Sequence, residues 1–101
     1  MGQRIDFAAV NRAALAALPA LLRRWLPDGR QVGREYLARN PLRADRRSGS
    51  FKINVRTGRW ADFATGDAGG DVISLCAYLA GIGQAEAAQS LGRMLGMLGH
   101  D

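Results

Sequence analysis

The stretch from Trp60 to Tyr78 reads WADFATGDAGGDVISLCAY, and it determines the predicted fold. Trp60 to Phe63 has the composition of a short strand, and the glycine-rich segment Gly66 to Gly70 is typical of a turn. Asp71 is a good N-cap for the apolar segment Val72 to Ala80, which has the length of a short helix. The stretch therefore predicts a strand, a turn and a helix in direct succession.

The preceding stretch, Asn40 to Gly58, reads NPLRADRRSGSFKINVRTG and predicts the partner strand. Between Ser50 and Val55, apolar and polar side chains alternate with the period of two that is typical of a half-buried strand. A further strand is expected at Arg34 to Arg39, because the following Asn40-Pro41 favours a turn or an extended end. The sequence therefore predicts a three-stranded antiparallel sheet.

Helical segments are expected on both sides of this sheet. Asp6 can act as an N-cap, and apolar residues then recur at spacings of three and four up to Trp25. Pro19 predicts either a kink or a second short helix that begins near it. A last helix is expected at about Gln84 to Met97. The predicted fold class is α+β, with one domain over residues 1–101: a helical segment at 1–27, the sheet at 30–65 and two helices at 71–97.

Length and composition set further bounds. With 101 residues and 48% hydrophobic residues, the chain can form one domain with a modest core. No apolar run approaches the roughly 18 residues that a membrane span needs, and no signal-peptide pattern begins the chain, so we expect a cytoplasmic protein without a membrane partner. The single cysteine, Cys76, excludes an internal disulfide and a zinc site built from cysteines.

The basic residues are concentrated in the middle of the chain. Eleven of the fourteen Lys and Arg residues lie between Arg23 and Arg59, where three acidic residues oppose them. Ten of these eleven are arginine, which binds phosphate through its two-pronged guanidinium better than lysine does. This asymmetry predicts a polyanionic partner, and the alternative is a basic face that is only solvated.

Residues suited to catalysis are scarce. The one histidine, His100, lies next to the end of the sequence, and no serine has a histidine near it in sequence. Asp62, Asp67 and Asp71 form a loose carboxylate cluster, but capping and turn formation explain Asp71 and Asp67 better than a metal does. The glycine-rich turn has neither the Lys-Ser/Thr pair of a P-loop nor the spacing of a dinucleotide site. We therefore expect a non-enzyme without a cofactor.

Aromatic residues are interleaved with the basic segment, as in proteins that bind single strands with charges for phosphates and rings for bases. Phe51 shares its strand face with Ile53 and is expected in the core. The candidate nucleic-acid-binding residues are six cations together with two aromatic residues for base stacking: Arg39, Arg46, Arg47, Lys52, Arg56, Arg59, Trp60 and Tyr36.

These motifs together resemble the N-terminal zinc-ribbon domain of bacterial and phage DNA primases, and especially its variants in primase-helicases of phages and mobile elements. The family has a Cys-Pro-x-His or Cys-Pro-x-Cys pair, a Ser-Phe strand, a Cys-x-x-Cys pair and a Gly-Gly-Asp helix start. The corresponding stretches here are Asn40 to Arg43, Gly49 to Phe51, Asp62 to Thr65 and Gly69 to Asp71. The resemblance covers residues from about Leu18 to Gly96, but every zinc ligand is replaced.

The resemblance implies a metal-free, zinc-ribbon-like accessory domain that binds single-stranded template DNA, or RNA, beside a Toprim or helicase domain in the same or another chain. The family's catalytic carboxylates lie in the Toprim domain, which is absent here. At the four ligand positions we expect a cross-link that replaces the metal, with Arg43 and Asp62 forming a salt bridge and Asn40 and Thr65 adding hydrogen bonds. Packing of Leu42 against Phe63 is the alternative. The alternative function is a protein-interaction module that has lost both metal and DNA binding.

Overall fold

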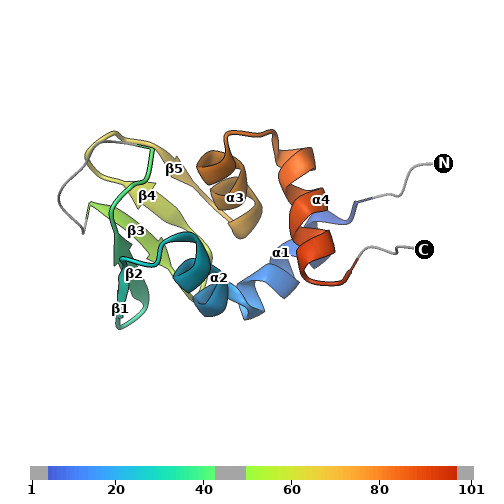
Figure 1. Cartoon of the computed structure of the whole chain (residues 1–101), viewed down its shortest axis with the longest axis horizontal. Helices are drawn as coiled ribbons and strands as arrows, with labels where there is room; N and C mark the ends of the chain where they lie inside the picture. Colours follow the sequence, from blue (N-terminus) through green and yellow to red (C-terminus); the bar gives the residue numbers. More distant parts are fainter. Residues whose placement is uncertain (1–4, 43–49, 98–101) are drawn as a thin grey trace.

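The computed structural model describes residues 5–42 and 50–97, which form an α+β fold (Figure 1). Within these residues the chain forms four helices and five strands. In chain order they are α1 (Phe7–Ala16), α2 (Leu18–Trp25), β1 (Arg30–Val32), β2 (Glu35–Ala38), β3 (Phe51–Asn54), β4 (Trp60–Asp62), β5 (Ala68–Gly69), α3 (Val72–Ala80) and α4 (Gln84–Met94).

The sheet is antiparallel, and each strand pairs with the next in the order β1-β2-β3-β4-β5. The three predicted strands correspond to β2, β3 and β4, so the predicted number of strands was too low. The two additional strands lie at the edges of the sheet. β1 has three residues that are all exposed, and β5 has only two residues, so neither shows an apolar alternation in the sequence.

The helix boundaries follow local capping chemistry. Asp6 accepts a hydrogen bond from the Ala9 N–H (3.0 Å), which confirms it as the N-cap of α1. A new helix, α2, begins at Leu18 with Pro19 in its first turn, so the second of the two alternatives for this proline is correct. Asp71 and Ser74 form a capping box at the start of α3. The helix α4 ends at Met94 rather than at about Met97 as predicted.

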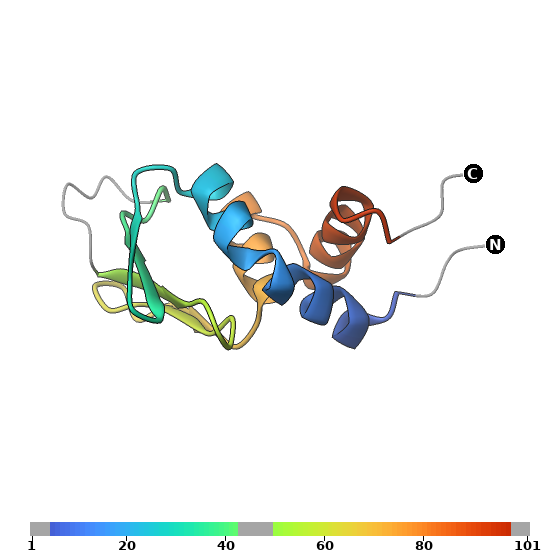
Figure 2. The same ribbon diagram turned by 90° about the horizontal axis from the view of Figure 1, so that it is seen from below.

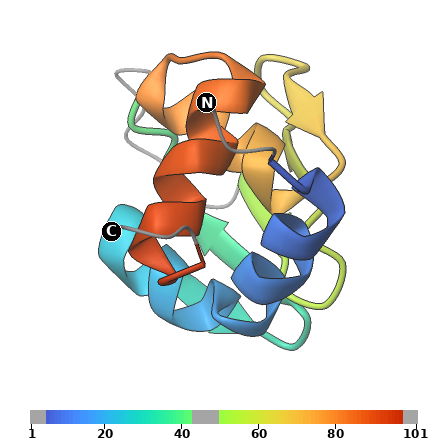
Figure 3. The same cartoon turned by 90° about the vertical axis from the view of Figure 1, so that its right-hand side faces the viewer.

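The helices lie on one side of the sheet, and no helix of the described residues covers the other side (Figures 1 and 2). The molecule is elongated, at 45 × 24 × 20 Å, with the sheet at one end and α4 at the other. The helix α1 packs against both α3 and α4, as the end-on view in Figure 3 shows. None of the described helices has the length and apolar character that crossing a membrane requires.

A single hydrophobic core joins the sheet to the helices. Phe51, Ile53 and Trp60 from the sheet belong to the same buried cluster as Leu22 of α2 and Leu75 of α3. The sheet is therefore fixed to the helices through one face, and within residues 5–42 and 50–97 the other face carries no helix.

Candidate nucleic-acid interface

Strand register divides the sheet into an inner face toward the helices and an outer face. Tyr36, Ile53 and Trp60 lie side by side on the inner face, because Ile53 is paired with both of the others. The outer face contains the neighbouring partners Leu37, Lys52 and Ala61. The predicted phosphate-binding residue Lys52 therefore lies on the face that no described helix covers.

A shallow depression of about 210 Å³ lies on this outer sheet face, and Lys52 is one of the residues that line it. The Lys52 ammonium nitrogen lies 5.4 Å from the centroid of the Phe63 ring and 4.0 Å from the nearest carboxylate oxygen of Glu35. Phe63 is 71% exposed, so most of its ring surface is in contact with solvent. Arg59 and Asn54 line the same depression. The site therefore combines two cations, one carboxylate and an exposed aromatic ring.

The two aromatic residues predicted to stack on bases are in the core instead. Trp60 is 5% exposed, and its indole N–H donates a hydrogen bond to the Ser74 hydroxyl (3.0 Å). Tyr36 is 4% exposed, and its hydroxyl donates to the Leu26 carbonyl (2.7 Å). Burial raises the pKa of the Tyr36 phenol, which keeps it protonated as a donor. Base stacking needs an exposed ring face, and neither residue presents one.

The other predicted cations are distributed over several places. Arg56 is exposed in the turn between β3 and β4, which also contains Arg59. Arg39 lies apart from the depression and lines a pocket with Trp25 and Pro41. Arg46 and Arg47 lie outside the described residues.

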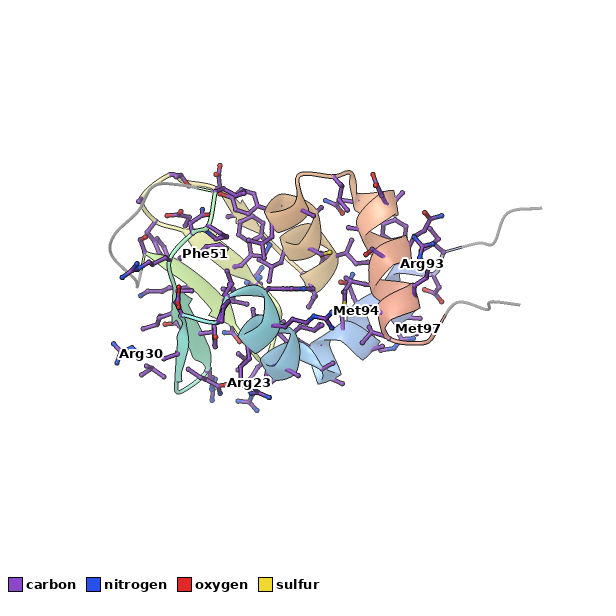
Figure 4. The ribbon with its side chains drawn as sticks, in the orientation of Figure 1. Arg23, Arg30, Phe51, Arg93, Met94 and Met97 are labelled. Carbon is purple, nitrogen blue, oxygen red and sulfur yellow. The ribbon has the colours of Figure 1, made fainter. Side chains whose placement is uncertain are left out.

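Arg30 adds a cation that was not among the predicted site residues. It is exposed on β1 and is paired with Leu37, so it belongs to the outer face. In Figure 4 it lies at the sheet end of the molecule, whereas Arg93 lies at the opposite, helical end. Among the described cations of the middle segment, Arg30 and Lys52 therefore lie on the outer sheet face, and Arg59 lines the depression there.

The two turns that correspond to the ligand-bearing turns of the resemblance are joined by side chains. The Asn40 amide donates a hydrogen bond to the Asp62 carboxylate (2.8 Å), and both residues are almost completely buried, at 1% and 0% exposure. Each side chain also accepts a hydrogen bond from the backbone N–H two residues later, at Leu42 and Ala64 (both 2.9 Å). The two turns therefore have the same local geometry and meet at one buried contact.

Tyr78 of α3 connects this buried contact to the helix. Its hydroxyl accepts a hydrogen bond from the Asn40 amide and donates one to the Asp67 carboxylate (both 2.8 Å). Burial, together with the hydrogen bond to Asp67, raises the pKa of the Tyr78 phenol, although the Asn40 hydrogen bond opposes the shift. The phenol therefore stays protonated at neutral pH and connects both turns to the helix.

The remaining parts of the predicted cross-link have different outcomes. Arg43 lies outside the described residues, so its predicted salt bridge with Asp62 stays a prediction. The Thr65 hydroxyl lies 3.5 Å from the Asp62 carbonyl and accepts a hydrogen bond from the Asp67 N–H (3.1 Å). Leu42 and Phe63, whose packing was the alternative, are 52% and 71% exposed.

Other reactive groups do not form a second site. Among residues 5–42 and 50–97, no group of three His, Cys, Asp or Glu side chains could hold a metal ion. Cys76 is buried, and desolvation raises the pKa of its thiol, which makes it a poor nucleophile. These observations leave the outer sheet face as the candidate site.

Sequence reasoning missed two residues of importance, Phe63 and Tyr78. Phe63 follows the inner residue Asp62, so strand alternation places it on the outer face, but this requires knowing which residues of β4 point inward. Tyr78 lies seven positions after Asp71 on an apolar helix, and nothing in the sequence distinguishes it from an ordinary core residue.

No protein-family model and no curated protein sequence matches the chain.

Proposed function

We propose that this chain is a nucleic-acid-binding accessory domain whose preferred ligand is single-stranded DNA, bound on the outer sheet face. The observation that supports this most strongly is the position of Lys52 and Arg59 beside the exposed ring of Phe63. Phosphates bind to the cations, and an unpaired base can stack on the ring. Phe63 takes the stacking role that the sequence suggested for Trp60 or Tyr36.

The ligand class follows from the shape of the site. Among residues 5–42 and 50–97, no helix lies on the outer sheet face that could enter a duplex groove, and the face is formed by short strands with an exposed ring. Single strands, in contrast, expose the faces of their bases and are bound by rings and cations on a flat or shallow surface. A single-stranded ligand, DNA or RNA, therefore suits the outer sheet face better than a duplex does.

We further propose that the fold is a metal-free zinc-ribbon-like domain of a primase or primase-helicase, acting beside a Toprim or helicase domain. In a ribbon, two turns approach each other at a shared metal ion. Here Asn40 and Asp62 approach each other at the corresponding positions, and their turns have matching hydrogen bonds. An amide–carboxylate contact then replaces the metal.

Restoring the ligands tests this part of the proposal. A variant with cysteine at all four positions (Asn40, Arg43, Asp62 and Thr65) is expected to bind one Co²⁺ per chain tetrahedrally through its thiolates, because the two turns already meet. The visible absorption of thiolate-bound Co²⁺ and its displacement by Zn²⁺ measure the site. The parent chain is the control. A four-cysteine variant that folds but binds cobalt only octahedrally, through solvent, would contradict the ribbon-like assignment.

Removing cations tests the binding itself. Replacement of Lys52, Arg56 and Arg59 by alanine should weaken binding to a thymidine oligonucleotide. If about four to six phosphates are contacted, the slope of log K against log salt should be about −3 to −4 for the parent. The triple variant should have a slope smaller in magnitude by about 2, because each lost contact removes about 0.7. Fluorescence anisotropy over a salt series gives both slopes.

The matched control has the same change in net charge. Arg12, Arg24 and Arg93 are all exposed on helices, and a triple alanine variant at these positions should bind with nearly the parental slope. Equal slopes for the two triple variants would mean that the outer sheet face is only a solvated basic surface.

A second candidate function, a protein-interaction module, is supported by a different feature. An apolar pocket of about 340 Å³ is lined by Trp25, Pro41, Cys76, Leu79 and Ala80, between α2 and α3. Exposed apolar side chains also occur on α1 and α4, at Phe7 and Met94, and beyond the end of α4, at Met97. A chain that binds no nucleic acid, but whose Leu79→Arg variant loses a protein partner, would favour this function.

A further inference from the structure

The depression on the outer sheet face contains a carboxylate, and phosphate binding does not explain it. Glu35 lines the depression together with Lys52, Asn54, Arg59 and Phe63. A carboxylate repels phosphate, so at this position it is suited to a hydrogen-bond donor of the ligand instead. In a single strand, the available donors are the ring N–H and amino groups of the bases.

The Glu35 carboxylate and the Lys52 ammonium form an acceptor and donor pair in the depression that Phe63 also lines. The Glu35 carboxylate only accepts hydrogen bonds, whereas the Lys52 ammonium, 4.0 Å away, only donates them. The same ammonium lies 5.4 Å from the centroid of Phe63. A base that stacks on Phe63 with its Watson–Crick edge toward Lys52 would meet an acceptor and a donor that lie next to each other.

We propose that this depression binds one base of the single strand and prefers guanine; this inference rests on the proposed function. The guanine edge offers two adjacent donors, N1–H and the N2 amino group, to the two oxygens of Glu35. Its O6 accepts from Lys52. Adenine and cytosine each offer one amino donor, and thymine places its single N–H between two carbonyls, one of which faces the carboxylate. The expected order is guanine first, adenine and cytosine next, and thymine last.

The test compares otherwise identical thymidine oligonucleotides that contain one central guanine, hypoxanthine, adenine or cytosine. Fluorescence anisotropy should show that the guanine oligonucleotide binds about ten-fold more tightly than the all-thymine one. Hypoxanthine lacks only the N2 amino group, so it should lose much of this preference. Glu35→Gln should abolish the guanine preference, so that the guanine and all-thymine oligonucleotides bind with similar affinity, because a neutral amide no longer offers two acceptor oxygens to the guanine edge.

Phe63→Ala tests the stacking part of the inference. Because Phe63 is 71% exposed, the variant should keep the parental melting temperature. It should bind the guanine oligonucleotide about ten-fold more weakly, with an unchanged salt slope, because stacking involves no counterion release. Phe63→Tyr is the conservative control and should retain both affinity and base preference.

The possible outcomes separate the two proposals. If all oligonucleotides bind equally well, or if Glu35→Gln keeps the guanine preference, the base-recognition inference is wrong and the proposed function is not affected. If no oligonucleotide binds to the parent chain, both are wrong. A preference for a base other than guanine that depends on Glu35 would overturn the assignment of guanine.

Discussion

Replacement of Trp60 by alanine is expected to lower the free energy of unfolding by about 3–5 kcal/mol, because it removes a large buried ring. The indole packs edge-to-face on Phe51, with ring centroids 6.1 Å apart, and lies 4.6 Å from the ring centroid of Tyr78. Its N–H also binds Ser74, which is part of the capping box of α3. Urea denaturation of the parent and the variant measures the difference.

Two variants control this prediction. Trp60→Phe keeps much of the packing and loses the hydrogen bond to Ser74, so it should cost only about 1–2 kcal/mol. Phe63→Ala removes an exposed ring three residues later and should change stability by less than about 0.5 kcal/mol. If Trp60→Ala were as stable as Phe63→Ala and instead lost DNA affinity, Trp60 would be a base-stacking residue and its buried position would be wrong.

The second large effect is expected at the junction of the two turns. Asp62→Ala should lower the free energy of unfolding by about 2–4 kcal/mol, because it removes acceptors for the buried Asn40 amide and the Ala64 N–H. Asp62 and Asn40 have 0% and 1% exposure, so water does not reach the Asn40 amide without a local rearrangement. Thermal unfolding followed by circular dichroism should show a clear decrease in melting temperature.

Asp67→Ala is the matched control, because Asp67 is an exposed aspartate of the same segment that accepts a hydrogen bond from Tyr78. It should cost less than about 1 kcal/mol. A double-mutant cycle with Asn40→Ala measures the coupling of Asn40 and Asp62, which should be at least about 1 kcal/mol. Additive effects of the two substitutions would show that the contact does not join the turns.

The parts of the fold that could be predicted have strong local signals. The alternation of apolar and polar residues in β3 predicted which of its side chains point inward, and the N-cap Asp71 predicted the start of α3. The edge strands had no such signal, because exposed strands of two or three residues bury no apolar side chain. The early end of α4 follows from Gly96, which has a positive φ of 72° that a helix does not allow.

The sequence predicted a site residue correctly only where the pattern of a single strand was enough to assign the side chain to one face of the sheet. Lys52 could be assigned to the polar face from β3 alone. Trp60 and Tyr36 could not be assigned, because their orientation depends on pairing with Ile53, which is a property of the sheet and not of either strand. The same pairing turns Asp62 inward and leaves Phe63 on the outer face. Register, rather than composition, therefore decided which aromatic residue is available to a ligand.

The contact between Asn40 and Asp62 has a consequence for the conditions under which this protein can work. Zinc held by thiolates is released when the metal becomes scarce, when a chelator competes for it, or when oxidants attack the sulfur atoms. An amide and a carboxylate have none of these weaknesses. A domain joined in this way needs neither a zinc supply nor reduced thiols to keep its two turns together, so the nucleic-acid binding proposed for it would not depend on them either.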